Sequence, residues 1–143
     1  MATMADREAL IDAIASFTLF ADLTSPQLEA VVHIFDERLF AEGERVLHQG
    51  LSGMGFFVIV EGEAVIEIDG NERARLGRGE FFGEVSILLG VPTIADVTAA
   101  RQLRCLVLAG NRVEPFLVGN PKVMFRILQA QARRLRAANR WSS

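Results

Sequence analysis

The chain has 143 residues, which is enough for one domain that buries a hydrophobic core. Half of the residues are hydrophobic and 23% are charged, and the net charge of -3 argues against a nucleic-acid-binding surface spread over the whole molecule. Cys105 is the single cysteine, which excludes an internal disulfide and a cysteine-based zinc cluster, and its apolar neighbours predict a buried thiol. No stretch approaches the roughly 20 apolar residues that span a bilayer, and the N-terminus lacks a signal-peptide pattern, so we expect a cytoplasmic protein.

Two helices are predicted at the start of the chain. The segment from Ala5 to Phe17 reads as an amphipathic helix. Thr24-Ser25-Pro26-Gln27 is typical of a helix start, because it places a hydroxyl cap before a proline in the first turn. The second helix is therefore expected from Gln27 to about Phe35.

From Arg38 onward the pattern is that of short strands separated by glycine-bearing turns. Asp69-Gly70-Asn71 is a strong hairpin signal between two of these strands. About eight short strands predict a mainly β protein, an antiparallel jelly roll, and the lack of alternation between strands and helices excludes a doubly wound parallel sheet. The clearest strand segments are residues 45–47, 56–60, 64–68, 73–76, 95–99 and 103–108.

The C-terminal part is predicted to be helical. Asn111 is expected to cap a short turn, and Asn120-Pro121 to start a long helix that ends near Arg140. Apolar spacing along this helix predicts a weak coiled-coil-like seam, through which a homodimer could form, at Met124, Leu128, Gln131, Leu135 and Ala138. The same helix carries a group of arginines, for which we expect a solvated face, with an acidic partner or nucleic acid as the alternative: Arg126, Arg133, Arg134, Arg136 and Arg140.

Residues 79–97 form the most informative segment. Gly83 and Glu84 open a short apolar helix, and the segment from Gly90 to Pro92 closes it. Backbone N–H groups at a helix start favour an anion, whereas Glu84 is suited to accept hydrogen bonds from hydroxyls such as those of a ribose. The alternative for Glu84 is a carboxylate that is favourable at a helix N-terminus without any ligand.

The order of these parts resembles the cyclic-nucleotide-binding domain family from about Phe17 to Arg136. The similarity rests on the segment Phe20-Ala-Asp-Leu-Thr-Ser-Pro-Gln-Leu28, on Glu42-Gly43-Glu44 with Gly50, on Phe57-Val-Ile-Val-Glu-Gly62, and on Phe82-Gly83-Glu84. The resemblance implies one domain over residues 1–143, with N-terminal helices in 1–36, a β-roll in 37–109 that includes the cassette 79–97, and C-terminal helices in 110–143.

The resemblance also implies a ligand, cAMP or cGMP, and a set of residues that bind it. Gly83 would supply a backbone donor, Glu84 the acceptor for the ribose 2′-hydroxyl, and Val85 and Ser86 amides that face the phosphate. An apolar floor for the purine would come from Ile66, Ala74 and Leu76. Residues near the end of the last helix, such as Asn139 and Trp141, would cover the base.

The cassette departs from the family pattern at Thr93 and Ile94, where the family has an arginine followed by a small residue. A charged hydrogen bond contributes about 1.5–3 kcal/mol, so its loss predicts an affinity for phosphate lower by roughly ten- to a few-hundred-fold. Thr93 can still donate one neutral hydrogen bond. Arg78 and Arg101 are candidate replacements for the missing cation.

These observations favour a regulatory or sensor domain that binds a cyclic nucleotide or a related small anion and signals through the C-terminal helix. The alternative is a ligand-free structural or dimerisation module that acts through a partner protein. No catalytic constellation is evident, His33 and His48 lack metal-ligand spacing, and we expect neither an enzyme nor a metal nor a cofactor. No DNA-reading helix follows the last predicted helix, so DNA binding would need a partner chain.

Overall fold

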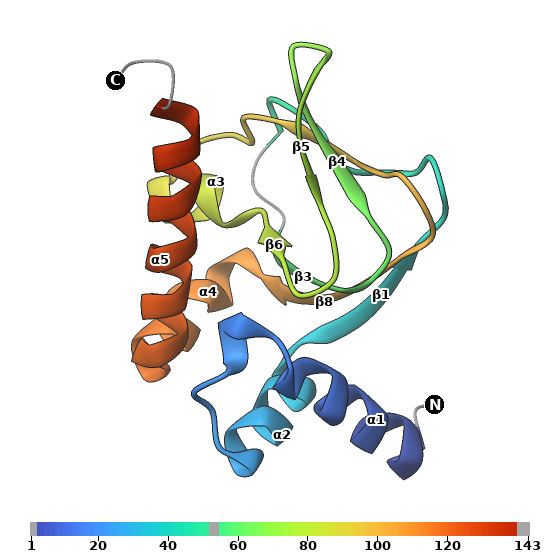
Figure 1. Cartoon of the computed structure of the whole chain (residues 1–143), viewed down its shortest axis with the longest axis vertical. Coiled ribbons are helices and arrows are strands. Elements are labelled where there is room, and N and C mark those ends of the chain that lie inside the picture. Colours follow the sequence, from blue (N-terminus) through green and yellow to red (C-terminus); the bar gives the residue numbers. More distant parts are fainter. Residues whose placement is uncertain (1–2, 52–54, 140–143) are drawn as a thin grey trace.

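The computed structural model describes residues 3–51 and 55–139, and it starts with a helical layer (Figure 1). Helix α1 (Met4–Ala15), the short 3-10 helix η1 (Thr18–Phe20) and helix α2 (Ser25–Ile34) lie below the strands. The predicted start of the second helix is confirmed: the Thr24 hydroxyl accepts from the Gln27 N–H, and the Gln27 side chain accepts from the Thr24 N–H at 2.8 Å. This reciprocal arrangement satisfies two backbone donors at the helix end.

Eight strands follow among the described residues, and they form two four-stranded antiparallel sheets. One sheet has the order β1-β8-β3-β6 and the other the order β2-β7-β4-β5. The predicted antiparallel roll with flanking helices is thereby confirmed. The strands are β1 (Asp36–Phe40), β2 (Arg45–Leu47), β3 (Gly55–Glu61), β4 (Ala64–Ile68), β5 (Asn71–Leu76), β6 (Phe81–Phe82), β7 (Asp96–Ala99) and β8 (Leu103–Ala109).

Strand β3 separates two hydrophobic cores. Phe56, Val58 and Val60 pack against the helices, whereas Phe57 and Ile59 pack between the two sheets. Successive side chains of a strand point to opposite faces, so a strand that is covered on both sides reads as a continuous apolar run. Strand β3, whose side chains enter both cores, is therefore the centre of the fold.

Cys105 lies on β8 in the core between the sheets and is fully buried. Burial raises the pKa of its thiol to about 12, because the thiolate would lose its hydration. At neutral pH this cysteine is a protonated, apolar core residue, as its sequence neighbours predicted.

Helix α3 (Glu84–Leu89) lies between β6 and β7, and its start depends on Gly83. Gly83 has φ +92°, and a Cβ atom there would collide with the backbone carbonyl oxygen of Gly55 and lie 3.2 Å from the Phe57 ring. Glycine is needed because only it combines this backbone conformation with so close an approach to β3. The helix ends at Gly90, also with positive φ, as predicted.

Two helices follow β8 in the described part of the chain, α4 (Gly110–Gly119) and α5 (Pro121–Ala138). The long helix begins at Asn120-Pro121 as predicted, but the expected cap at Asn111 is wrong, because Asn111 lies inside α4 and Ala109 precedes its first turn. In Figure 1, α5 runs along one side of the molecule, and α3 passes behind it in this view. Arg140 and Trp141 lie outside the described residues.

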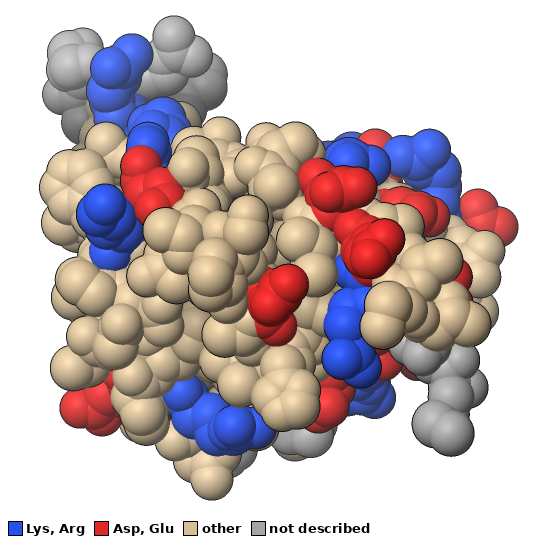
Figure 2. All heavy atoms as spheres, turned by 90° about the horizontal axis from the view of Figure 1, so that it is seen from below, with Lys and Arg blue, Asp and Glu red and all other residues tan. Residues whose placement is uncertain are grey.

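Charged side chains are interspersed on the face shown in Figure 2, where both signs occur with much uncharged surface between them. This face carries no single-sign field of the kind that attracts nucleic acid. Among residues 3–51 and 55–139, none of the helices has the length and apolar character required to cross a bilayer.

Candidate ligand-binding site

A small cavity of about 120 Å³ lies where the roll, the cassette and α5 meet. Its walls come from three parts of the chain. The strands contribute Leu47, Ile66, Ile68, Phe82 and Val97; the cassette contributes Gly83, Glu84, Val85, Ser86, Thr93, Ile94 and Ala95; and α5 contributes Arg134. The strand residues that line it are apolar, whereas its two charged groups, Glu84 and Arg134, come from the cassette and from α5.

The structure brings together most of the residues that the sequence nominated: Ile66 and every nominated cassette residue line this cavity. Leu76 and Ala74 do not line it, so the structure does not place these two members of the predicted apolar floor beside Ile66 in the cavity. Leu76 pairs with Ala64 and is buried in the core between the sheets, whereas the cavity lies toward the other end of β4, beside Ile66 and Ile68. Ala74 is exposed.

Glu84 is the central group of the cavity. Its side chain is almost completely buried, with 1% of the residue exposed. Its Oε1 accepts hydrogen bonds from the Gln131 side-chain amide and from Arg134 at 3.1 Å, whereas Oε2 is buried without a partner in the described part of the chain. Burial raises the pKa of the Glu84 carboxyl, and the contacts with Arg134 and Gln131 oppose this rise. A buried oxygen with free lone pairs is an acceptor available to a ligand hydroxyl.

Arg134 is the cation nearest to this carboxylate. It also donates to the backbone carbonyl of Phe81 at 2.9 Å and lies over the Phe81 ring, 4.6 Å from the centroid. The candidate replacements Arg78 and Arg101 do not line the cavity. The prediction of a solvated arginine face is therefore wrong for Arg134. The i, i+3 spacing of Gln131 and Arg134 puts them on one face of α5, but the sequence does not say what that face contacts.

Thr93 is buried at the position where the family pattern has arginine, with 8% of the residue exposed. Its backbone N–H donates to the Leu51 carbonyl at 2.8 Å, and its carbonyl accepts from Gly50 at 2.7 Å. These bonds fix the backbone and leave the short side chain at the cavity wall. Ile94, which is half exposed, lies at the rim. Within the described residues, no cluster of His, Cys, Asp and Glu side chains suits a metal ion.

Comparison with known proteins agrees with this architecture. The family model of the cyclic nucleotide-binding domain matches residues 37–120, more than half of the chain. A putative potassium channel protein of Rhodopseudomonas palustris is 32% identical over 119 residues, which cover 81% of this chain and 29% of that protein. The chain belongs to the cyclic nucleotide-binding domain family, as the sequence resemblance predicted. It spans less than a third of the curated relatives it matches.

Solved structures share the fold. A triple variant of the regulatory subunit of a cAMP-independent protein kinase A from Trypanosoma brucei, bound to cAMP, superposes with a TM-score of 0.74 at 21% identity, covering 87% of this chain and 46% of that one. The corresponding Trypanosoma cruzi subunit bound to guanosine gives a TM-score of 0.69 at 23% identity, covering 88% of this chain and 50% of that one.

Proposed function

We propose that this domain is a regulatory domain that binds a nucleoside or a cyclic nucleotide, cAMP or cGMP, in the Glu84 cavity and signals through α5. The observation that carries the proposal is the buried Glu84 carboxylate, which has one oxygen without a partner among residues 3–51 and 55–139 and the other held by α5. A carboxylate oxygen in this position can accept a hydrogen bond from a ribose hydroxyl. Ile66, Ile68 and Val97 offer apolar surface for the base.

The cyclic phosphate is the part of the ligand that this cavity is least equipped to bind. A bidentate arginine would neutralise it, and Thr93 can offer only a neutral hydroxyl. We therefore expect the affinity for cAMP and cGMP to be lower by roughly ten- to a few-hundred-fold than that of a site with the arginine. A nucleoside lacks the phosphate and would not incur this loss.

The trypanosome structures support a role for this position. The Trypanosoma brucei variant bound to cAMP replaces glutamate by alanine, threonine by arginine and the adjoining valine by alanine, and its replaced glutamate stands seven positions before the threonine. Here Ser86 stands at the same spacing before Thr93, which is followed by the β-branched Ile94. The Trypanosoma cruzi subunit was bound to guanosine. This likeness of pattern favours an uncharged nucleoside as one ligand class.

The route of signalling follows from what a ligand would displace. The Oε1 atom of Glu84 is occupied by Gln131 and Arg134 of α5, so a ribose whose hydroxyls bind Oε1 as well as Oε2 competes with both donors. The small cavity volume also requires the walls to move apart, since small-molecule sites usually enclose about 300–1,000 Å³. Ligand binding would thus loosen the contact between cassette and α5, and α5 would transmit the change.

Calorimetric titration with adenosine, guanosine, cAMP and cGMP tests the proposal. We expect at least one of them to bind, and Glu84→Gln to weaken it by about tenfold or more because the charged acceptor is lost. Glu42→Gln is the matched control, since Glu42 is exposed in the β1–β2 turn and the same charge is removed. Failure of all four to bind the wild-type chain would contradict the proposal, as would equal loss in both variants.

The second candidate function is a ligand-free module that dimerises or docks on a partner protein. The observation that favours it is an apolar stripe on α5, where Met124, Phe125, Leu128 and Leu135 are 44% to 63% exposed. Such a stripe is typical of a contact surface. If no ligand binds and the chain is a dimer, this function replaces the first.

A further inference from the structure

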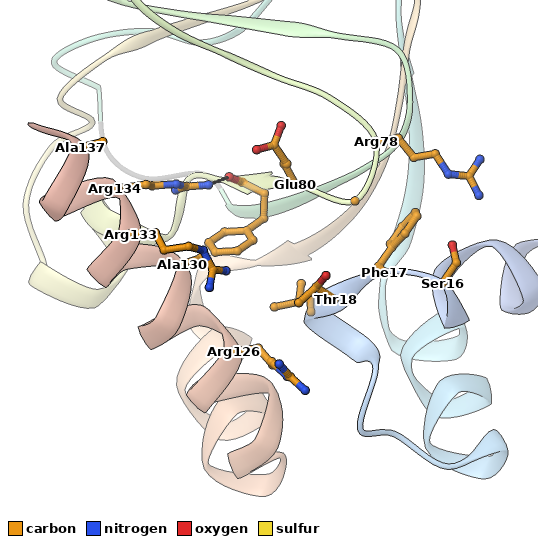
Figure 3. A pocket seen from close by; sticks show the side chains of 13 residues that line it. Ser16, Phe17, Thr18, Arg78, Glu80, Arg126, Ala130, Arg133, Arg134 and Ala137 are labelled. Atoms are coloured by element: carbon orange, nitrogen blue, oxygen red, sulfur yellow. Dashed lines mark hydrogen bonds between the residues drawn. The ribbon is translucent and has the colours of Figure 1, made fainter.

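A second cavity of about 550 Å³ lies on the other side of Arg134, between α5, η1 and the turn that joins β5 and β6 (Figure 3). We call it the arginine cleft, because its walls include Arg78, Arg126, Arg133 and Arg134. Its volume falls within the range of small-molecule sites. The four guanidinium groups make it a local exception on a chain whose net charge is -3.

Two of the four arginines are already neutralised by carboxylates. Arg126 holds Asp22 through two hydrogen bonds, at 2.8 and 3.1 Å, and Arg134 is bound to Glu84. Arg78 and Arg133 have no carboxylate partner among residues 3–51 and 55–139. The cleft therefore has two positive charges that an anion could neutralise, that of Arg133 beside α5 and, at its outer end, that of Arg78, whose guanidinium group points away from α5 (Figure 3).

One carboxylate, that of Glu80, also belongs to the wall of the cleft. It accepts a hydrogen bond from the Gly77 N–H at 2.7 Å, and in Figure 3 it points away from α5. The same view shows Arg126 and Arg133 extending from α5 toward the side of Thr18. Glu80 thus serves the turn between β5 and β6, and the space in front of α5 keeps its positive character.

The guanidinium groups at the two ends of the cleft are held by aromatic rings. Arg78 lies 5.5 Å from the centroid of the Phe17 ring, and Arg134 lies 4.6 Å from that of Phe81. Between them, α5 presents the small side chain of Ala130, which leaves the space open (Figure 3). Stacked guanidinium groups lose little further freedom when they bind, and their planar forks match the oxygens of a phosphate.

We propose that the arginine cleft is a second ligand site, distinct from the Glu84 cavity, for a small phosphate-bearing anion. Arg133 and Arg78 bind the anion, and the arginines that are paired with carboxylates contribute field and shape. The cleft size selects a small molecule with more than one phosphate rather than a single inorganic ion, because the charges are distributed along a cavity and not gathered at one point.

Arg134 borders both cavities, which couples them. It is bound to Glu84 on one side and to the Phe81 carbonyl at the wall of the cleft on the other. An anion in the cleft attracts Arg134 away from Glu84 and so frees the carboxylate for a ligand hydroxyl. The expected coupling is positive, each ligand raising the affinity for the other. This coupling rests on the proposed function, whereas anion binding in the cleft does not.

Titration of the chain with inorganic pyrophosphate at constant ionic strength, followed by the amide shifts of assigned NMR spectra, tests the site. We expect shifts at α5, η1 and the β5–β6 turn, and a dissociation constant weakened by about tenfold or more in the double variant Arg78→Ala/Arg133→Ala. Arg73→Ala/Arg136→Ala is the matched control, since it removes the same charge from β5 and from α5 outside the cleft.

Three results would overturn the cleft as a site. They are absence of binding, equal weakening in the two double variants, and shifts that are scattered over the whole surface as expected for general charge attraction. All variants change exposed or half-exposed side chains, and thermal unfolding of each verifies that the fold is retained.

The coupling is tested by repeating the nucleoside titrations in saturating pyrophosphate. We expect a severalfold gain in nucleoside affinity that is lost in Arg134→Gln. If both ligands bind but pyrophosphate does not change the nucleoside affinity, the coupling is wrong and the cleft still stands as an anion site. Pyrophosphate binding without any nucleoside binding would instead show that the proposed function fails while the second site stands.

Discussion

At the scale of single residues, Glu84 ties the stability of the fold to pH. Burial raises the pKa of its carboxyl above the ordinary value of 4.5. The folded chain therefore holds the proton more tightly than the unfolded chain. The protonated carboxyl adds its whole contribution to the free energy of unfolding below the unfolded pKa, and this contribution is lost as pH rises through the folded pKa.

Glu84→Gln removes this titration. We expect the free energy of unfolding of the variant, relative to wild type, to increase as pH rises from about 4 to about 8, because only the wild type must then bury a charge. Urea denaturation of both proteins across this range measures the difference, in which the titration of all other groups cancels. A difference that is independent of pH would contradict the assigned shift.

Gly83 is the residue that positions Glu84. The loss of stability when it is replaced has two parts, the strain of positive φ and a collision with a neighbouring backbone. Gly83→Ala should lower the free energy of unfolding by about 2 kcal/mol or more, because it adds a collision with the Gly55 carbonyl to the strain of positive φ. Gly43→Ala is the control, since Gly43 has φ +85° but no atom within 4 Å of an added Cβ, so it should cost only about 1 kcal/mol. Equal losses in urea denaturation would exclude the collision.

Local motifs predicted the residues of the cassette but not their partners. Gly83, Glu84 and Thr93 were identified because a short run of sequence encodes a turn, a helix start and a missing cation. Leu76 was misplaced, since the alternation of β5 does not reveal at which end of the hairpin the cavity lies. Arg134 was read as a solvated side chain, because its contact with Glu84 joins segments that no local pattern relates.

At the scale of elements, α5 is held to the cassette through Gln131 and Arg134, which both donate to Glu84. Arg134→Ala removes one of the two donors to Glu84 and leaves the buried carboxylate without its cation. We therefore expect the free energy of unfolding to fall by about 1–3 kcal/mol. Arg136→Ala, on the same helix but outside both cavities, should change it by less than about 0.5 kcal/mol. Equal effects of the two substitutions would show that the link is not energetically important.

The elements themselves were mostly predictable. The helix starts at Thr24 and at Asn120-Pro121 follow from capping chemistry, and the long strands follow from apolar patterning. Strand β6 escaped prediction because two residues are too few to show a period. Asn111 was taken for a cap because asparagine favours helix starts, yet here Gly110 already lies in the helix.

At the scale of the whole molecule, the apolar stripe of α5 predicts self-association. Met124, Leu128 and Leu135, which the sequence assigned to a seam, are exposed, whereas Gln131 turns to Glu84. We expect sedimentation to show a dimer that Leu128→Glu dissociates, because a charge would then lie in the apolar contact. Lys122→Glu, at an exposed position near the start of α5, is the control. A wild-type chain that stays monomeric at high concentration would contradict the homodimer.

We propose that the Glu84 cavity recognises the nucleoside part of a ligand and lacks the cation for a cyclic phosphate. Calorimetry of Thr93→Arg with cAMP and with adenosine tests it most directly, and Gln102→Arg adds the same charge at an exposed turn as control. We predict that Thr93→Arg raises the affinity for cAMP by roughly ten- to a few-hundred-fold and leaves the affinity for adenosine nearly unchanged. Gln102→Arg should change neither affinity. Wild-type binding of cAMP as tight as that of Thr93→Arg would contradict the claim.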